Sequence, residues 1–268
     1  MHRFAIIIPA RFASTRFPGK PLVPLRGAGG IVKSLIERTW ECASAVPGCA
    51  GVWVATDDGR IASEVERFGG QVVMTSPTCA NGTERCAEAV ERIGDVAEFV
   101  VNLQGDAPLS PSAVVKRLIV RLVDDQEVAM ATPAISCSPS TYRHLLADRA
   151  AGRVGGTTVV FTDAYRALYF SKEVIPFAPG GLEAASLPVP VHLHLGLYAY
   201  RPEALNRYRQ APMSRLEQLE GLEQLRFLEL GMPISVVEIE PLSWDPIELN
   251  NPDDVTIIER TLASRGIQ

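Results

Sequence analysis

Short apolar runs alternate with segments of helical periodicity in the first half of the chain. Four short runs are typical of strands, and they cover residues 4–9, 51–56, 71–75 and 99–103. The first is continuously apolar, as in a strand buried on both faces of a parallel sheet. Apolar residues at helical spacing predict helices between them, over residues 31–45, 58–68 and 83–93. This alternation predicts an α/β fold with a doubly wound, mainly parallel sheet.

The pattern loosens after Asp125. Strand-like segments follow at residues 128–133, 157–161, 167–170 and 195–200, separated by glycine- and proline-containing loops. Residues 216–230 carry a leucine at every third position up to Leu228, and they predict one continuous helix. We therefore expect a smaller subdomain in the second half of the chain.

Composition excludes several classes of protein. The 268 residues are 47% apolar, which is ample for a core, and the net charge of -5 includes no local basic cluster for nucleic acid. No apolar stretch approaches the roughly 20 residues of a membrane span, and the amino terminus has no signal-peptide pattern. Five cysteines without CxxC spacing suggest reduced, mostly buried thiols. We expect a cytoplasmic protein without membrane partners.

A loop with three cations follows the first predicted strand directly. Arg11, Arg16 and Lys20 lie among small residues, and Gly19 allows the loop to wrap closely around a ligand. Fixed positive charge and free backbone N–H groups suit a triphosphate whose oxygens gain charge as pyrophosphate leaves. The spacing matches neither a Walker loop nor a dinucleotide fingerprint. A merely solvated basic loop is the alternative at this point.

Two further loops end at the same predicted sheet edge. Asp106 follows the strand 99–103 and is suited to hold Mg²⁺, although an aspartate that caps a turn fits equally well. In the segment 81–85, Thr83 is expected to cap the following helix while Arg85 points to the ligand edge. Gly82 would leave backbone exposed to a flat base. These loops predict a nucleotide site.

Seven ordered motifs resemble those of the CMP-Kdo synthetases (3-deoxy-manno-octulosonate cytidylyltransferases) over nearly the whole chain. They are IIPARFASTRFPGKPL from Ile7, VATDD from Val54, NGTER from Asn81, VNLQGDAP from Val101, ALYFSK from Ala167, HLGLYAYR from His194 and LEQLRFLELG from Leu222. The resemblance implies a Rossmann-like nucleotidyltransferase fold, usually a homodimer, that uses CTP and Mg²⁺ and releases pyrophosphate. It also implies a single domain, with a nucleotide-binding half at 1–125 and an acceptor-binding and dimerisation half at 126–268.

The resemblance assigns roles to individual residues. It implies Arg11, Lys20 and Asp106 as the catalytic groups, with Asp106 on magnesium. The nucleotide side would comprise Pro9, Ala10, Arg11, Arg16, Lys20, Asn81, Gly82, Thr83, Arg85 and Gln104. The acceptor side would comprise Lys172, His194, Tyr198, Glu220, Glu223 and Gln224. Structural roles stay open on that side, because a tyrosine or a histidine can simply belong to a core and glutamates to the wet face of a helix.

The chain departs from the family pattern mainly on the acceptor side. Ala107, Lys172 and Leu193 replace a glutamate, an arginine and a basic residue, and Thr157-Thr158-Val159 replaces Val-Lys-Val. Asn250 stands where the family has the aspartate that shares the metal with the QGD loop. A neutral amide binds magnesium more weakly than a carboxylate does. Asp245, Glu248 or the acceptor itself are the alternatives that would complete the metal shell.

These departures leave three further hypotheses open. The main expectation is transfer of CMP from CTP to a small acidic acceptor, either Kdo or a related acid. A small phosphonate, as in phosphonate-antibiotic biosynthesis, is an alternative acceptor that could itself supply negative oxygens to the metal. A non-catalytic CTP-binding paralogue fits the Asn250 substitution. A nucleotidyltransferase for another nucleotide is disfavoured by the cytidine-type NGTER and QGD loops.

Overall fold

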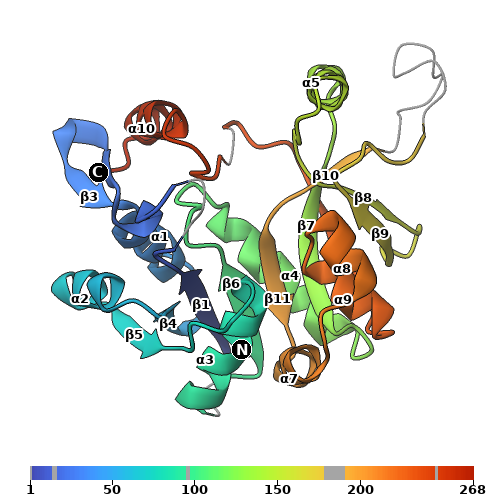
Figure 1. The fold of residues 1–268 in the computed structure, drawn as a ribbon, viewed down its shortest axis with the longest axis horizontal. Helices are drawn as coiled ribbons and strands as arrows, with labels where there is room; N and C mark the ends of the chain where they lie inside the picture. The colour runs from blue at the N-terminus through green and yellow to red at the C-terminus, as the bar shows by residue number, and fades with distance from the viewer. Residues whose placement is uncertain (1, 14–16, 95–96, 178–190, 245–246) are drawn as a thin grey trace. The chain divides into compact units, whose positions relative to one another are not determined.

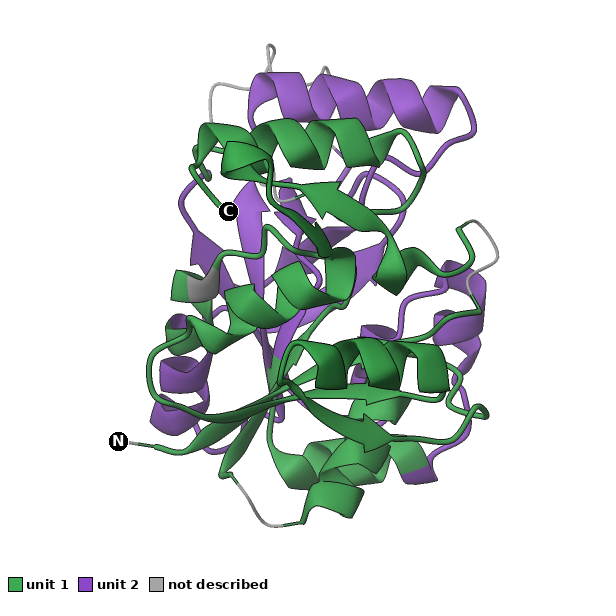
Figure 2. Ribbon diagram, turned by 90° about the vertical axis from the view of Figure 1, so that its left-hand side faces the viewer, with its two compact units in different colours: residues 1–116, 199–209, 242–268 green, residues 117–198, 210–241 purple. Residues whose placement is uncertain are grey.

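The computed structural model describes residues 2–13, 17–94, 97–177, 191–244 and 247–268. The chain forms two compact units, and each is built from segments that are distant in sequence (Figure 2). Unit 1 comprises residues 1–116, 199–209 and 242–268, and unit 2 comprises residues 117–198 and 210–241. The strand β11 (Leu197–Tyr200) and the helix α4 (Ser112–Asp124) contribute residues to both units.

Unit 1 contains a parallel sheet in the order β5-β4-β1-β6 (Figure 1). Its strands are β1 (Phe4–Ala10), β4 (Cys49–Thr56), β5 (Gln71–Met74) and β6 (Phe99–Leu103), and all three pairings are parallel. Every residue of β1 and β6 is buried, as the apolar run of β1 predicts, and β6 also buries the polar Asn102. The predicted parallel α/β arrangement is confirmed in this unit.

Polar side chains set the starts of the unit 1 helices. Ser34, Asp58 and Asn81 each accept a backbone N–H at the start of α1 (Leu35–Ser44), α2 (Gly59–Arg67) and α3 (Gly82–Ile93). The expectation of a helix from residue 31 is wrong, because Val32–Ser34 forms β3 and pairs with β2 (Pro24–Arg26). The remaining elements here are α7 (Pro202–Gln210), α10 (Asp254–Ser264) and the 3₁₀ turns η1 (Lys20–Leu22) and η2 (Ala28–Gly30).

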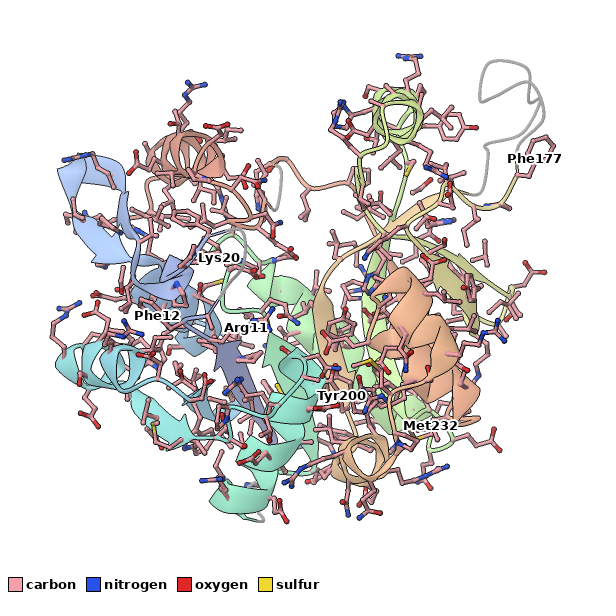
Figure 3. The ribbon with its side chains drawn as sticks, viewed as in Figure 1. Arg11, Phe12, Lys20, Phe177, Tyr200 and Met232 are labelled. Atoms are coloured by element: carbon pink, nitrogen blue, oxygen red, sulfur yellow. The ribbon has the colours of Figure 1, made fainter. Side chains whose placement is uncertain are left out.

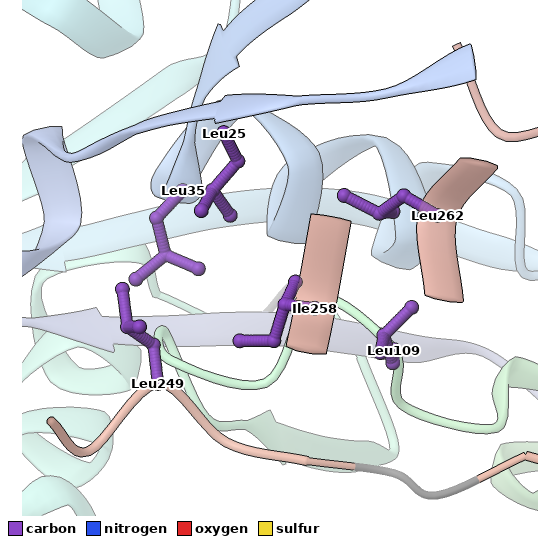
Figure 4. Packing of buried hydrophobic residues seen from close by; sticks show 6 residues of the cluster. All are labelled: Leu25, Leu35, Leu109, Leu249, Ile258 and Leu262. Atoms are coloured by element: carbon purple, nitrogen blue, oxygen red, sulfur yellow. The ribbon is translucent and has the colours of Figure 1, made fainter. Parts of the chain in front are cut away.

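One cluster of aliphatic side chains ties the carboxyl-terminal segment to the rest of unit 1 (Figure 4). It consists of Leu25, Leu35, Leu109, Leu249, Ile258 and Leu262, all of which are fully buried. The cluster joins α10 to the β2–β3 hairpin, to α1 and to the loop after β6. Burial of such side chains stabilises a fold by roughly 1.5–3 kcal/mol each. It therefore holds the segment around Leu249 firmly against the loop that carries Asp106.

Unit 2 uses mostly antiparallel pairing. Its central strand β7 (Met130–Ser136) pairs in parallel with β12 (Ile234–Ile239) and antiparallel with β10 (His192–His194). β8 (Thr158–Phe161) then pairs antiparallel with both β10 and β9 (Ala167–Ser171), and α5 (Pro139–Ala150) follows β7. The strands predicted in this half are present, with shifted ends and with β10 and β12 as additions. Short hairpin connections explain why the βα alternation fades here.

The single helix expected over residues 216–230 is wrong. The segment forms two short helices, α8 (Arg215–Glu220) and α9 (Gln224–Glu229), separated by Gly221 in a left-handed conformation with φ 61° and ψ 38°. A buried ion pair joins them, with Arg226 donating from Nε to Glu217 at 2.6 Å and from Nη2 at 2.7 Å. Leucine spacing alone does not register this break, and Leu219 is 72% exposed.

The structure also bears on the expectations about membrane spans and cysteines. Within the described ranges, no helix is both long and apolar enough to cross a membrane. All five cysteines are free, but the expectation that they are mostly buried is wrong, because Cys86 is buried and the other four are half-buried.

Candidate active site

The loop after β1 is held in a compact form by contacts to Phe12. The N–H of Gly19 donates to the carbonyl of Phe12 at 3.0 Å, and Gly19 has φ +72°. A Cβ on Gly19 would lie 3.1 Å from the Phe12 ring, so glycine is required there. The guanidinium of Arg60 lies 3.3 Å from the centroid of the same ring and also pairs with Asp58.

This loop presents Arg11 and Lys20 near the end of β1 (Figure 3). Arg11 is exposed, and among the described residues it has no ion-pair partner. Lys20 is half-buried and donates from Nζ to Oδ2 of Asp106 at 2.5 Å. Arg16 lies outside the described residues. The predicted catalytic lysine and carboxylate therefore meet directly.

Asp106 lies in a tight turn after β6. The N–H of Ala107 donates to the carbonyl of Gln104 at 3.1 Å. A Cβ on Gly105 would lie 2.6 Å from the carbonyl oxygen of Pro9, so the close approach of these two strand ends requires glycine. Parallel strands bring their carboxyl ends to one edge of a sheet, and this approach puts Asp106 beside the cationic loop.

The segment that carries Asn250 also reaches Asp106. The N–H of Leu249 donates to the backbone carbonyl of Asp106 at 2.8 Å. The N–H groups of Asn250 and Asn251 both donate to Oδ2 of Asp254, at 2.8 and 2.7 Å, which shapes the turn before α10. Asn250 is thus anchored next to Asp106.

These groups form a sparse donor set for a divalent cation. No group of three or more histidine, cysteine or acidic side chains is assembled for a metal in the described part of the chain. Glu248 is half-buried, and Asp245 lies outside the described residues. One carboxylate, Asp106, with an adjacent amide suits Mg²⁺, which binds through one or two carboxylates and takes its other ligands from water and substrate phosphates. The residues present therefore fit a magnesium ion that arrives with a triphosphate.

The NGTER segment places small groups against the first strand. Gly82 opens α3, and a Cβ there would lie 3.4 Å from the Pro9 side chain and 3.5 Å from the Gln104 amide. Three residues expected at the base are therefore neighbours. The expectation that Thr83 caps the helix is wrong, because the side chain of Asn81 accepts the N–H of Glu84 at 2.8 Å. Thr83 is buried instead, with its hydroxyl 3.1 Å from that of Tyr200.

Arg85 lies at the expected sheet edge but is buried there. It is 3% exposed, and its Nη1 donates to Oγ1 of Thr75 at 2.6 Å. The same nitrogen lies 3.3 Å from Oδ1 of Asp57. Thr75 and Asp57 directly follow β5 and β4, so Arg85 joins the ends of these two strands to α3. Asp57 belongs to the VATDD motif, but no sequence pattern pairs it with Arg85.

His194 and Tyr198 belong to the core of unit 2. Nε2 of His194 lies 2.8 Å from the hydroxyl of Thr132, and its ring packs against Phe170 and Tyr198. Burial lowers the pKa of His194 to about 3. The imidazole is therefore neutral, and it cannot offer positive charge to an acidic acceptor.

Glu220 is held in place by the end of β9. It accepts hydrogen bonds from the Ser171 hydroxyl at 2.7 Å, the Lys172 N–H at 3.0 Å and the Tyr169 hydroxyl at 3.4 Å. Burial, and next the negative charge of Glu220, raise the pKa of Tyr169. Glu223 begins α9 as its N-cap. The adjacent Gln224 is 2% exposed, and its Nε2 has no hydrogen-bond partner among the described residues.

A cavity of about 370 Å³ lies within unit 2. Its lining includes Lys172 and Glu220 from the predicted acceptor set, with Arg149, Arg153, Val154, Tyr169, Glu173, Leu216, Leu219 and Gly152. His194, Tyr198, Glu223 and Gln224 do not line it.

The cations of this cavity differ in their pairing. Arg149 pairs with Glu173 at 2.5 Å and Arg153 with Asp148 at 2.6 Å. Lys172 has no acidic partner within the described ranges, which leaves its ammonium available for an anion. Sequence reasoning missed Arg149 and Arg153, because no motif covers the end of α5.

Known proteins share this arrangement along almost the whole chain. The profile of the cytidylyltransferase family matches residues 5–234. A 3-deoxy-manno-octulosonate cytidylyltransferase from Maricaulis maris (strain MCS10) is 45% identical over 260 residues, with 97% of each chain aligned. An 8-amino-3,8-dideoxy-manno-octulosonate cytidylyltransferase from Shewanella sediminis (strain HAW-EB3) is 38% identical over 264 residues, which cover 96% of this chain and 98% of that one.

A solved structure agrees with these relatives. The structure of a CMP:2-keto-3-deoxy-manno-octonic acid synthetase complexed with CTP superposes with a TM-score of 0.83 and 33% sequence identity. The match covers 98% of this chain and 99% of that one. It confirms the predicted nucleotidyltransferase fold. This chain belongs to the CMP-Kdo synthetase family of cytidylyltransferases.

Proposed function

We propose that this protein transfers CMP from CTP to the sugar acid Kdo (3-deoxy-manno-octulosonate) and releases pyrophosphate. The observation that carries the proposal is the contact between Lys20 and Asp106 at the ends of β1 and β6. A cation for the triphosphate and a carboxylate for its metal meet there, as phosphoryl-type transfer requires. The relatives named for Kdo and 8-amino-Kdo support an eight-carbon sugar acid as the acceptor class.

On the nucleotide side, the chain's task is to bind and orient CTP. Arg11 and Lys20 offset the charge that grows on the leaving pyrophosphate. Gly82, Pro9 and Gln104 form a closely packed surface beside the base. Magnesium, held by Asp106 and Asn250, would supply further charge neutralisation at the phosphates. An acceptor hydroxyl attacks the α-phosphorus in line with the leaving pyrophosphate, so the enzyme needs no covalent nucleophile.

On the acceptor side, unit 2 provides charge and hydrogen bonds. Lys172 offers an ammonium to the acceptor carboxylate, and Glu220 is held by three donors to accept from hydroxyl groups. The amide donor of Gln224 is buried and has no hydrogen-bond partner among the described residues, as expected of a group that a ligand satisfies. His194 is too deeply buried to carry charge, and it positions Tyr198 and Phe170.

We also propose a homodimer formed through unit 2. Leu146, Val154, Leu168 and Leu219 are large apolar side chains of this unit that are 42–72% exposed. Exposed apolar side chains of this kind are typical of subunit contacts. Light scattering after gel filtration tests this expectation. A cytoplasmic location is proposed from the five free cysteines, which are typical of a reducing compartment.

One observation favours a second candidate, a CTP-binding protein without transferase activity. Asn250 replaces a metal-binding carboxylate of the family pattern and lowers the negative charge at the metal site. A phosphonate acceptor gains no support from the relatives, whose names specify sugar acids.

Pyrophosphate release tests the proposal. Purified protein with Mg²⁺ is given CTP and, in turn, Kdo, 8-amino-Kdo, a sialic acid and a simple phosphonate, and the best acceptor is then paired with ATP, GTP and UTP. We expect release with CTP and Kdo, and loss of that release in the Asp106→Asn variant. Pyrophosphate release with the phosphonate and with no other acceptor would identify a phosphonate, rather than Kdo, as the acceptor. Silence with every acceptor, despite CTP binding, would favour the non-catalytic candidate.

A further inference from the structure

The carboxylate that would bind magnesium is already neutralised by a lysine. Nζ of Lys20 lies 2.5 Å from Oδ2 of Asp106, and both side chains are largely shielded, with exposed fractions of 15% and 23%. A shielded charge pair is screened less by salt than a surface pair is. Lys20 and a divalent cation therefore compete for the same negative charge.

The neighbouring segment does not restore that charge. Asn250 is fixed beside Asp106 by the hydrogen bond from the Leu249 N–H, and its side chain is a neutral amide. Within the described ranges, no cluster of three or more acidic, histidine or cysteine side chains supplements it. The Lys20, Asp106 and Asn250 side chains together carry a net charge of about zero at pH 7. A site without net negative charge binds a hydrated dication weakly, because it does not offset the free-energy cost of removing the ion's water ligands.

A triphosphate changes this balance. Its phosphate oxygens are stronger partners for an ammonium than one carboxylate is, and Lys20 lies in the loop that would wrap around them. Transfer of Lys20 to the phosphates leaves Asp106 available, and the phosphates add ligands of their own. We propose that the divalent metal enters this site only together with CTP, because Lys20 blocks Asp106 until the triphosphate engages that lysine. The inference rests on the proposed function.

Manganese binding tests the inference without any turnover. The probe is Mn²⁺, whose free ion is measured by electron paramagnetic resonance, with and without the unreactive analogue α,β-methylene-CTP. We expect wild-type protein alone to leave Mn²⁺ free, and protein with the analogue to retain about one ion per chain. Lys20→Met should bind Mn²⁺ without nucleotide on the order of tenfold more tightly than wild type or more. Asn250→Asp, which adds a carboxylate, should also gain nucleotide-free binding.

Matched controls separate this effect from a general change of charge. Lys20→Arg keeps the cation and should behave as wild type does. Lys33→Met removes another paired lysine of unit 1, which binds Glu41 at 2.6 Å, and it should leave Mn²⁺ free. Circular dichroism checks that each variant is folded. If Lys20→Met does not fold, Lys20→Gln, which is also uncharged but keeps a polar end, decides.

Two results would overturn the inference. Wild-type protein could bind Mn²⁺ without nucleotide as tightly as Lys20→Met does, or it could take up Mn²⁺ to the same extent with and without the analogue. Calorimetric titration of the analogue with and without Mn²⁺ tests the proposed function separately. If the analogue never binds, the proposed function fails, while the nucleotide-free arms still decide whether Lys20 blocks the metal.

Discussion

The proposed nucleotide side in unit 1 and the proposed acceptor side in unit 2 hold their candidate groups in different ways. In unit 1, Lys20 and Asp106 stand on loops at the ends of buried parallel strands, and glycines permit the close approaches. In unit 2, the candidate groups depend on hydrogen bonds inside the packed unit, as Glu220 does. The proposed nucleotide site thus depends on the sheet edge, and the proposed acceptor site depends on side-chain packing.

The largest expected effect concerns the packing of unit 2. Arg226→Met leaves the buried carboxylate of Glu217 without its partner, which should cost about 3–5 kcal/mol of unfolding free energy. Urea denaturation monitored by circular dichroism measures it. The double variant Arg226→Met with Glu217→Leu should recover much of the loss. A single variant as stable as wild type would show that the α8–α9 turn does not depend on this pair.

A smaller effect is expected in acceptor binding. Lys172→Met removes the cavity cation that has no acidic partner, and it should raise the KM for Kdo roughly 10- to 100-fold, as loss of a hydrogen bond between charged groups does. The KM for CTP should stay unchanged, and Lys172→Arg should retain most of the binding. Steady-state kinetics provides the readout. Equal increases in the KM values for Kdo and for CTP would contradict a role of Lys172 in acceptor binding alone.

The buried histidine predicts a pH dependence of stability. Because burial depresses the pKa of His194 to about 3, the folded protein keeps it neutral while the unfolded chain protonates it below about pH 6.5. The contribution of His194 to the free energy of unfolding is therefore fully present above about pH 6.5. It should fall by about 1.4 kcal/mol per pH unit as the pH drops toward 3. Denaturation at several pH values should show that the unfolding free energy of His194→Asn depends less on pH than that of wild type. The same pH dependence in both proteins would mean that water reaches the imidazole in the folded state.

The smallest expected effect concerns the cationic loop. Arg60→Met removes the guanidinium stacked on Phe12, and it should raise the KM for CTP by about two- to fivefold, because cation–π contacts at exposed sites are weak. Arg67→Met on the same helix is the control, because Arg67 pairs with Glu64 and Glu37 instead. A similar change in both variants would assign the effect to α2 rather than to the loop.

The difference between the two units also explains what the sequence could predict. β1 and β6 are predominantly apolar runs followed at once by polar loops, so the sheet edge and the neighbourhood of Lys20 and Asp106 were predictable. The positions of the groups at that edge depend on backbone geometry, which glycine positions and strand patterns in the sequence predict. The Mg²⁺ requirement stays a prediction.

Packing choices in unit 2 left weaker signals. The leucine spacing of residues 216–230 fits one helix, and only the left-handed Gly221 and the Arg226–Glu217 pair break it into two. The end of α5 lies outside every motif, so Arg149 and Arg153 were not foreseen in the cavity. The role of His194 depends on its burial, which one residue in a motif does not reveal. The helix break, the cavity lining and the burial of His194 each depend on backbone geometry or contacts that no single motif contains.

Direct observation of the product tests the central claim most clearly. CTP, Kdo and Mg²⁺ are mixed with the protein and followed by phosphorus nuclear magnetic resonance. The account predicts that the triphosphate signals give way to one phosphodiester and an equal amount of pyrophosphate, and that Asp106→Asn shows neither. Unchanged CTP in the presence of folded, CTP-binding protein and Kdo would contradict it.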